Sequence, residues 1–212
     1  MVKTKLLKGK KKRWYPILAP KLFNNQMLGE SLVADAESLV GKTMKINLMN
    51  LSKDPRKSNI NLTFVVKDVK EGKGIADIAG YEMISATVKR LVKKGKNKIN
   101  LSFECVTADG LLIRVKPLII TKNRTTGAIL SSLSNHCAED VKKYIAQVNF
   151  DDIIGQLLAH KLQMILKKQL TKVYPLRLFE LRSVKFVDNK NLTNPLNKSR
   201  GINREIFGIA QT

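Results

Sequence analysis

Apolar and polar residues alternate along two neighbouring stretches in the first half of the chain. Apolar side chains occupy every second position of 60–66, and the same spacing is present over 44–48. Because successive side chains of a strand point to opposite faces of a sheet, this period of two predicts strands. Residues 52–59 connect them, and a third strand is expected over about 74–80. The segment 20–40 is expected to be mostly irregular, with at most a short strand or turn.

A hairpin is predicted in the middle of the chain. Residues 99–105 alternate again, and a second apolar run covers 111–121. Between them, Asp109 and Gly110 tolerate the positive φ that a tight turn needs. Pro117 cannot donate a hydrogen bond to a neighbouring strand, so we expect a bulge or a sheet edge at this position.

Three segments have apolar residues three or four positions apart, the spacing that places them on one face of a helix. These segments cover about 82–94, 128–148 and 151–172. Asp151 and Asp152 stand at the start of the last one, where carboxylates are favourable because a helix N-terminus carries partial positive charge. We therefore predict one helix among the strands and two longer helices after the hairpin.

A last strand is expected over 176–187, and a change of phase in its apolar positions predicts a bulge. These elements indicate an α+β fold, a small and mainly antiparallel β-barrel with packed helices, because about five or six bulged strands curl readily. This domain is expected to cover 14–187. A disordered basic arm (1–13) would precede it, and a loosely ordered tail rich in Asn and Lys (188–212) would follow.

The net charge of the chain gives the first indication of its function. It has 39 Lys and Arg against 17 Asp and Glu, a formal net charge of +22. Self-repulsion of this size destabilises a compact protein, so an anionic partner is expected. A nucleic-acid backbone and an anionic membrane surface are the two candidates, and nucleic acid, above all RNA, is the better one.

The cations form groups along the chain. Those of the arm, with no acid among them, are Lys3, Lys5, Lys8, Lys10, Lys11, Lys12 and Arg13. A second group follows the predicted helix 82–94 and comprises Lys89, Arg90, Lys93, Lys94, Lys96 and Lys98, and a third, Lys122 and Arg124, follows the hairpin. A helix C-terminus favours one or two cations, but six exceed that need, so we predict phosphate contacts for all three groups.

Two further features have an alternative explanation. The cations of the last helix, Lys161, Lys167, Lys168 and Lys172, fit a solvated helix face as well as a phosphate contact. Trp14 and Tyr15, at the root of the arm, could stack on bases, although packing of the root against the folded body is the favoured role. Aromatic residues make up only 6% of the chain, so we expect contacts to the backbone and shape of RNA rather than to individual bases.

The sequence shows no catalytic constellation and predicts a protein that is not an enzyme. The histidines, His136 and His160, stand on predicted helices without further metal ligands nearby, and Cys105 and Cys137 form no CxxC motif. We therefore expect no cofactor and no metal. No apolar run is long enough to span a bilayer, and the basic start lacks the apolar core of a signal peptide, so a cytoplasmic location without membrane binding is expected.

Two motifs resemble one family, the archaeal and eukaryotic ribosomal protein S-three-A-e family, also called S-one-e. The opening motif is Lys12-Arg13-Trp14-Tyr15-x-x-x-Ala19-Pro20-x-x-Phe23. The closing motif is Val173-Tyr174-Pro175-Leu176-Arg177-x-x-Glu180-x-Arg182-x-x-Lys185. Shorter matches lie between them in the same order, so the resemblance covers about 12–187.

The resemblance implies a structural constituent of the small ribosomal subunit. It places the protein on the platform of that subunit, beside the 3′ region of the small-subunit rRNA, neighbouring ribosomal proteins and the exit of messenger RNA. Composition and charge on their own leave two alternatives open, an RNA-processing enzyme and a non-ribosomal RNA-binding protein. An enzyme of the metal-dependent nuclease type would need clustered carboxylates, whereas the 17 acids of this chain are scattered or belong to caps and turns.

Overall fold

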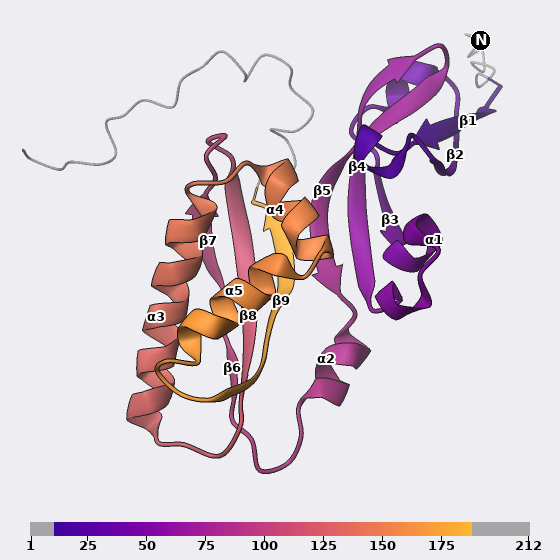
Figure 1. Ribbon diagram of the computed structural model, residues 1–212. Coiled ribbons are helices and arrows are strands. Elements are labelled where there is room, and N and C mark those ends of the chain that lie inside the picture. The colour runs from indigo at the N-terminus through magenta and orange to yellow at the C-terminus, as the bar shows by residue number, and fades with distance from the viewer. Residues whose placement is uncertain (1–10, 188–212) are drawn as a thin grey trace, which may run out of the picture.

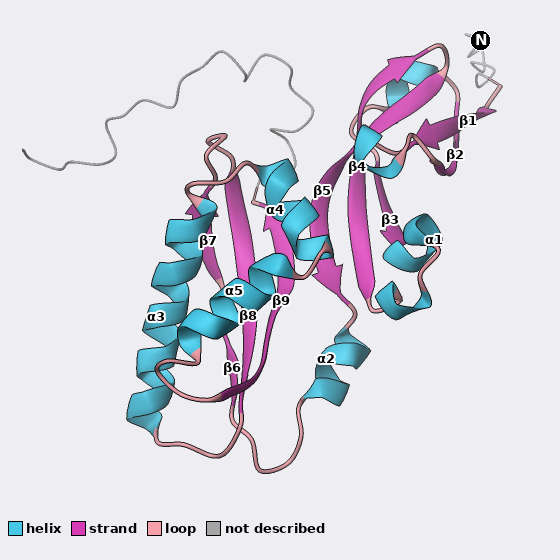
Figure 2. Cartoon of the chain, viewed as in Figure 1, coloured by secondary structure: helices cyan, strands magenta, loops and turns pink. Residues whose placement is uncertain are grey.

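The computed structural model describes residues 11–187, so residues 1–10 of the predicted arm and the whole predicted tail lie outside the described residues (Figure 1). The strands are β1 (Arg13–Leu18), β2 (Met27–Val33), β3 (Thr43–Asn47), β4 (Ile60–Lys70), β5 (Lys73–Met83), β6 (Lys98–Asn100), β7 (Phe103–Val106), β8 (Leu112–Thr121) and β9 (Leu176–Phe186). The helices are α1 (Leu48–Ser52), α2 (Ser85–Leu91), α3 (Gly127–Ile145), α4 (Phe150–Leu158) and α5 (Lys161–Leu170) (Figure 2).

Strand β5 joins the two parts of the sheet. It pairs with β4 along its length. A tight turn at Glu71 and Gly72 connects the two strands, and both residues have the positive φ that a two-residue hairpin turn requires. On its other edge, β5 pairs with β1 at its start and with β9 over Gly80–Glu82 at its end. A Cβ at Gly80 would lie 3.1 Å from the carbonyl oxygen of Val184, so the close approach of β5 and β9 favours a glycine here.

The α+β class and the mainly antiparallel pairing are confirmed, but the predicted closure into a barrel is not. The hydrogen-bonded order runs β2-β1-β5-β9-β8-β6. Outside this order, β4 pairs with β5, β3 pairs with β4, and β7 pairs with β8. Within residues 11–187 no pairing joins the ends of this order, so the sheet is open. The physical reason is that β1 and β9 share one edge of β5 at different ends, which makes the sheet branch instead of curling round.

Pro117 of β8 disrupts the pairing of this strand with its neighbours on both sides. The bulge predicted here is confirmed, because the register between β8 and β9 shifts between Lys116 and Pro117. The predicted single strand 99–105 is corrected to two short strands, β6 and β7. Leu101 donates its N–H to the Pro117 carbonyl at 3.2 Å, and proline has no N–H to return the bond.

Helices α3, α4 and α5 cover one face of the sheet formed by β7, β8 and β9 (Figure 1). Their inward side chains and those of the strands form one apolar core that includes Ile113, Val115, Leu133, Cys137, Val141, Ile154, Leu157, Leu162, Leu166, Phe179 and Leu181, all nearly inaccessible to water. Burying each such side chain stabilises the fold by about 1.5–3 kcal/mol. This core fixes the strand ends and loops that carry the cations.

The predicted long helix 151–172 is wrong as a single element. It breaks into α4 and α5 at His160, whose φ of 56° lies in the left-handed region that an α-helix cannot continue through. The predicted position of Asp151 and Asp152 in the first turn of the helix is confirmed for α4. The predicted helix 82–94 shortens to α2, because β5 continues to Met83.

Candidate nucleic-acid interface

The second and third cation groups, far apart in sequence, meet at one end of the sheet. The ammonium group of Lys96 donates to the carbonyl oxygen of Lys122 and to Oδ1 of Asn123. These contacts are possible because β6 pairs with the last part of β8, so the loops at those strand ends lie side by side. In Figure 1 this end is at the bottom, next to α2.

Asn97 and Thr121 hold the two loops in register. The N–H of Asn97 donates to the Thr121 hydroxyl at 3.0 Å, and the N–H of Thr121 donates to the Asn97 carbonyl at 3.1 Å. Oδ1 of Asn97 also accepts the N–H of Thr125 at 3.0 Å. These hydrogen bonds, together with those of the Lys96 ammonium group, fix the conformation of the two loops.

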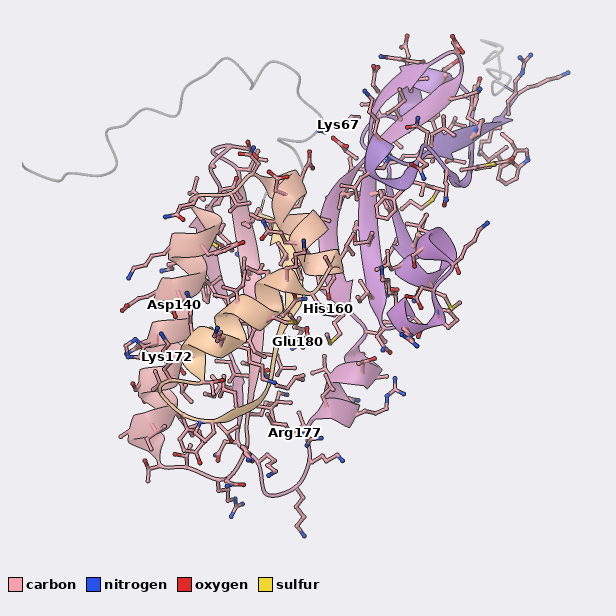
Figure 3. The ribbon with its side chains drawn as sticks, viewed as in Figure 1. Lys67, Asp140, His160, Lys172, Arg177 and Glu180 are labelled. Carbon is pink, nitrogen blue, oxygen red and sulfur yellow. The ribbon has the colours of Figure 1, made fainter. Side chains whose placement is uncertain are left out.

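A third loop, between α5 and β9, joins them. The N–H of Lys122 donates to the Pro175 carbonyl at 3.0 Å, and the Tyr174 hydroxyl donates to the carbonyl of Arg124 at 3.4 Å. We call residues 92–98, 122–126 and 172–175 together the three-loop surface. Lys172 of the last-helix group belongs to the three-loop surface. Arg177, labelled below α5 in Figure 3, lies next to this surface at the start of β9.

The three-loop surface presents its charges to solvent. Exposed side chains include those of Lys93, Lys94, Lys98, Lys122, Arg124 and Lys172, and Lys89 and Arg90 lie exposed on the last turn of α2. The sequence places no Asp or Glu in 83–103 or 110–138. Ion pairs elsewhere on the described sheet join Glu82 to Lys45 and Lys185, Asp77 to Lys67, and Glu104 to Arg114. The surface can therefore bind a polyanion without first breaking ion pairs of this kind.

The root of the predicted arm lies at the other end of the molecule. Lys11 and Lys12 are exposed and Arg13 begins β1, at the upper right of Figure 1, while the three-loop surface is at the bottom. The structure therefore does not bring these cations to the others, and Lys3, Lys5, Lys8 and Lys10 lie outside the described residues. The packing role favoured for the root of the arm is confirmed for Tyr15, which contacts the core, and is wrong for Trp14, which is 64% exposed.

The remaining candidate groups offer no reactive site. His136 is exposed on α3, and His160 is exposed at the break between α4 and α5 rather than on a helix. Burial raises the pKa of the Cys105 thiol to about 11 and that of Cys137 to about 12, so both thiols stay protonated near neutral pH. Within the described part of the chain, no three His, Cys, Asp or Glu side chains lie close enough to hold a metal ion.

The cations of the last helix serve partly as structural donors. Lys167 donates from its ammonium group to the carbonyl of Arg177 at 3.0 Å, which ties α5 to β9. Lys161 and Lys168 are exposed on α5. As for a membrane, no helix within residues 11–187 has the length and apolar character needed to cross one.

An open α+β sheet with an exposed, internally hydrogen-bonded cationic surface defines a class of protein suited to binding polyanions. Within that class, the model of the Ribosomal S3Ae family matches residues 2–190, and the chain belongs to this family. The resemblance carried by the opening and closing motifs is thus confirmed.

Relatives named small ribosomal subunit protein eS1 are similar along most of their length. The one from Staphylothermus marinus is 28% identical over 180 residues, which cover 85% of each chain. The one from Methanothrix thermoacetophila is 27% identical over 180 residues, also 85% of each chain. The one from Halorubrum lacusprofundi is 27% identical over 173 residues, which cover 82% of this chain and 80% of the relative.

Proposed function

We propose that this protein is a structural constituent of the small ribosomal subunit that binds rRNA phosphates with its basic arm and its three-loop surface. The observation that carries the proposal is the joining of two separate cation groups by Lys96, Asn97 and Thr121 into one surface. Family membership supports the ribosomal setting, since the relatives are named small ribosomal subunit proteins. The role is structural and involves no chemical step.

A pre-formed surface favours binding to an irregular, folded RNA. Loops that are already ordered lose little conformational entropy on binding, so more of the electrostatic attraction appears as affinity. Each phosphate that a Lys or Arg neutralises releases counterions, which makes affinity fall steeply with salt. Six exposed cations on the three-loop surface give such contacts without reading bases.

The placement within the subunit is also part of the proposal. We assign the protein to the platform, beside the 3′ region of the small-subunit rRNA, neighbouring ribosomal proteins and the exit of messenger RNA, in cytoplasmic ribosomes. What supports this placement is the resemblance of the opening and closing motifs to the family. Crosslinking of the assembled subunit, followed by sequencing of the attached RNA, tests it: attachment to the 5′ region alone would contradict it.

The decisive experiment compares incorporation into small subunits. The quadruple variant Lys93→Gln, Lys94→Gln, Lys122→Gln and Arg124→Gln should sediment with small subunits less than the unaltered chain and show a smaller salt dependence. The matched control changes four exposed cations elsewhere, Lys53→Gln, Arg56→Gln, Lys70→Gln and Lys143→Gln, with the same loss of net charge. Equal losses for the two variants would mean that total charge, not the three-loop surface, matters.

The arm has its own test. Deletion of residues 2–10 leaves β1 intact, because the pairing of β1 with β2 begins at Arg13 and Val33. The shortened chain should associate more weakly with small subunits and with a reduced salt slope. Incorporation equal to that of the full chain would remove the arm from the proposal. Divalent-metal-dependent cleavage of RNA by the pure protein would instead favour the RNA-processing alternative.

A further inference from the structure

The solvent side of the β1–β2 hairpin carries two large apolar side chains directly opposite each other. Trp14 of β1 pairs with Leu32 of β2 in the antiparallel register, and their side chains are 64% and 43% exposed. The alternate positions, Tyr15 and Ile17 on β1 and Val33 on β2, face the core. Trp14 and Leu32 therefore stand on the face of the hairpin that turns away from the core.

Stabilisation of the hairpin does not account for this exposure. A cross-strand pair of this kind contributes only about 0.2–1 kcal/mol to a sheet, and a smaller or polar pair would serve on a solvated face. Most of the indole surface is left open to water. An exposed tryptophan on a regular strand, beside a second exposed apolar residue, is the kind of feature that marks a binding surface.

The surrounding charge indicates the chemistry of the partner. Three cations stand at the start of the hairpin, the exposed Lys11 and Lys12 immediately before β1 and Arg13 as its first residue, against one acid within its two strands, the exposed Glu30, which lies opposite Pro16 on the same face as Trp14. A partner must therefore offer negative charge next to a flat apolar surface. An unpaired nucleotide has both, since its base has a π face that stacks on indole and its phosphate is anionic.

We propose that Trp14 and Leu32 form a stacking platform for an unpaired RNA base, and that Lys11, Lys12 and Arg13 hold the flanking phosphates. This proposal rests on the proposed RNA-binding function and deepens it, because it adds base stacking to backbone contact. It also assigns a kind of RNA to each end of the molecule. The hairpin end takes a single-stranded segment, whereas the three-loop surface takes the phosphates of folded RNA.

The chain contains one tryptophan, so its intrinsic fluorescence reports on Trp14 alone. Titration of the full 212-residue protein with an unstructured oligouridine should quench this fluorescence as the complex forms. Polyphosphate of similar charge should bind without comparable quenching, because it has no bases to stack. Equal quenching by both polyanions would overturn the stacking proposal, since the signal would then follow charge alone.

Variants separate stacking from charge. Trp14→Ala should weaken oligouridine binding by roughly 5- to 150-fold at every salt concentration, with an unchanged salt slope, because no charge is lost. Trp14→Phe should keep most of the affinity, since a phenyl ring still stacks. Lys12→Ala should instead lower the slope of log affinity against log salt by about 0.7. Thermal unfolding of each variant checks that the hairpin is intact.

The outcomes distinguish this proposal from the one it rests on. If Trp14→Ala leaves the affinity for oligouridine unchanged, the stacking platform is overturned, while the proposal that the loops bind RNA is unaffected. If neither oligouridine nor rRNA binds the unaltered protein, the proposed function itself fails. A fluorescence change that appears only when RNA-free small-subunit proteins are added would mean that the hairpin face contacts a neighbouring protein, which also overturns the proposal.

Discussion

The carboxylate of Asp109 accepts a hydrogen bond from the backbone N–H of Phe150, with a distance of 2.9 Å between Oδ2 and N. Asp109 belongs to the turn between β7 and β8, and Phe150 is the first residue of α4. Asn149 occupies the N-cap position of this helix, but its side chain makes no capping hydrogen bond. A hairpin turn thus supplies the cap for a helix 41 positions farther along the chain.

Loss of this cap should destabilise the protein. Asp109→Ala leaves the N–H of Phe150 without its acceptor and removes a negative charge from the positive end of α4, so we expect a loss of about 1–2 kcal/mol in the free energy of unfolding. Asp109→Asn should lose less, because its amide oxygen can still accept. Urea unfolding of the two variants measures the difference. Equal stability of Asp109→Ala and the unaltered chain would contradict this role.

Glu82 links the two parts of the sheet and should give a pH-dependent contribution to stability. Its Oε2 accepts from Lys45 of β3 at 2.8 Å and from Lys185 of β9 at 2.9 Å, and these hydrogen bonds lower the pKa of the carboxyl to about 2. Because the pKa is lower in the folded state, the contribution is present above about pH 4.5 and is lost as the pH falls towards 2.

The matching variant is Glu82→Gln. All three side chains are about one third to one half exposed, so solvent screening limits the expected loss to about 1 kcal/mol at pH 7, shrinking towards zero near pH 2. Chemical denaturation at several pH values measures this. Glu139→Gln, an exposed position on α3, serves as the control and should leave the profile unchanged. A loss for Glu82→Gln that is the same at all pH values would refute the linkage.

A carboxyl beneath α5 behaves in the opposite way (Figure 3). Burial raises the pKa of Glu180 on β9 to about 7, against smaller opposing effects from Gln163 and Lys167. Its Oε2, the Oε1 of Gln163 and the hydroxyl of Tyr81 are buried without a hydrogen-bond partner in the described part of the protein. Protonation gives the Glu180 carboxyl an O–H donor and removes a buried charge, which is consistent with the raised pKa.

The folded state therefore binds this proton more tightly than the unfolded state. Its stabilising effect is full below about pH 4.5 and is lost as the pH rises through 7, so the unaltered protein should lose roughly 2 kcal/mol of stability between pH 5 and pH 8 from this group. Glu180→Gln, which stays neutral, should remove that decrease and be the more stable protein at pH 8. Parallel pH profiles for the two proteins would contradict the assignment.

Strong local patterns predicted the fold where each strand has one buried face. Strand β4 and the hairpin β7–β8 follow the alternation read from the sequence, and the bulge expected in β9 is confirmed by a register shift between Ile120 and Thr121 of β8. Strand β1 was missed, and β2 lies in a segment for which at most a short strand or turn was expected, because Pro16 and Gly29 interrupt their alternation. The barrel and the single long helix failed for non-local reasons, the branching at β5 and the left-handed His160.

The candidate site was predicted only in pieces. The cation groups at 89–98 and 122–124 are visible as local runs of charge, but their meeting depends on the pairing of β6 with β8. Asn97, Thr121 and Tyr174, which tie the loops, carry no local signal, since single polar residues in loops are common. The exposure of Trp14 also depends on tertiary structure, because an aromatic residue on a short strand is buried more often than not.

Asn97 gives the sharpest test of whether loop order matters for binding. Asn97→Ala removes the acceptor for the N–H of Thr125 and should cost about 1 kcal/mol of stability. It should also raise the hydrogen-exchange rate of the Thr125 amide. RNA affinity should fall several-fold, because the loops must now be ordered on binding. The salt slope should not change, because all cations remain. Asn100→Ala, an exposed position on β6, is the matched control. Faster exchange at Thr125 without any loss of RNA affinity would show that the cations act regardless of how the loops are held.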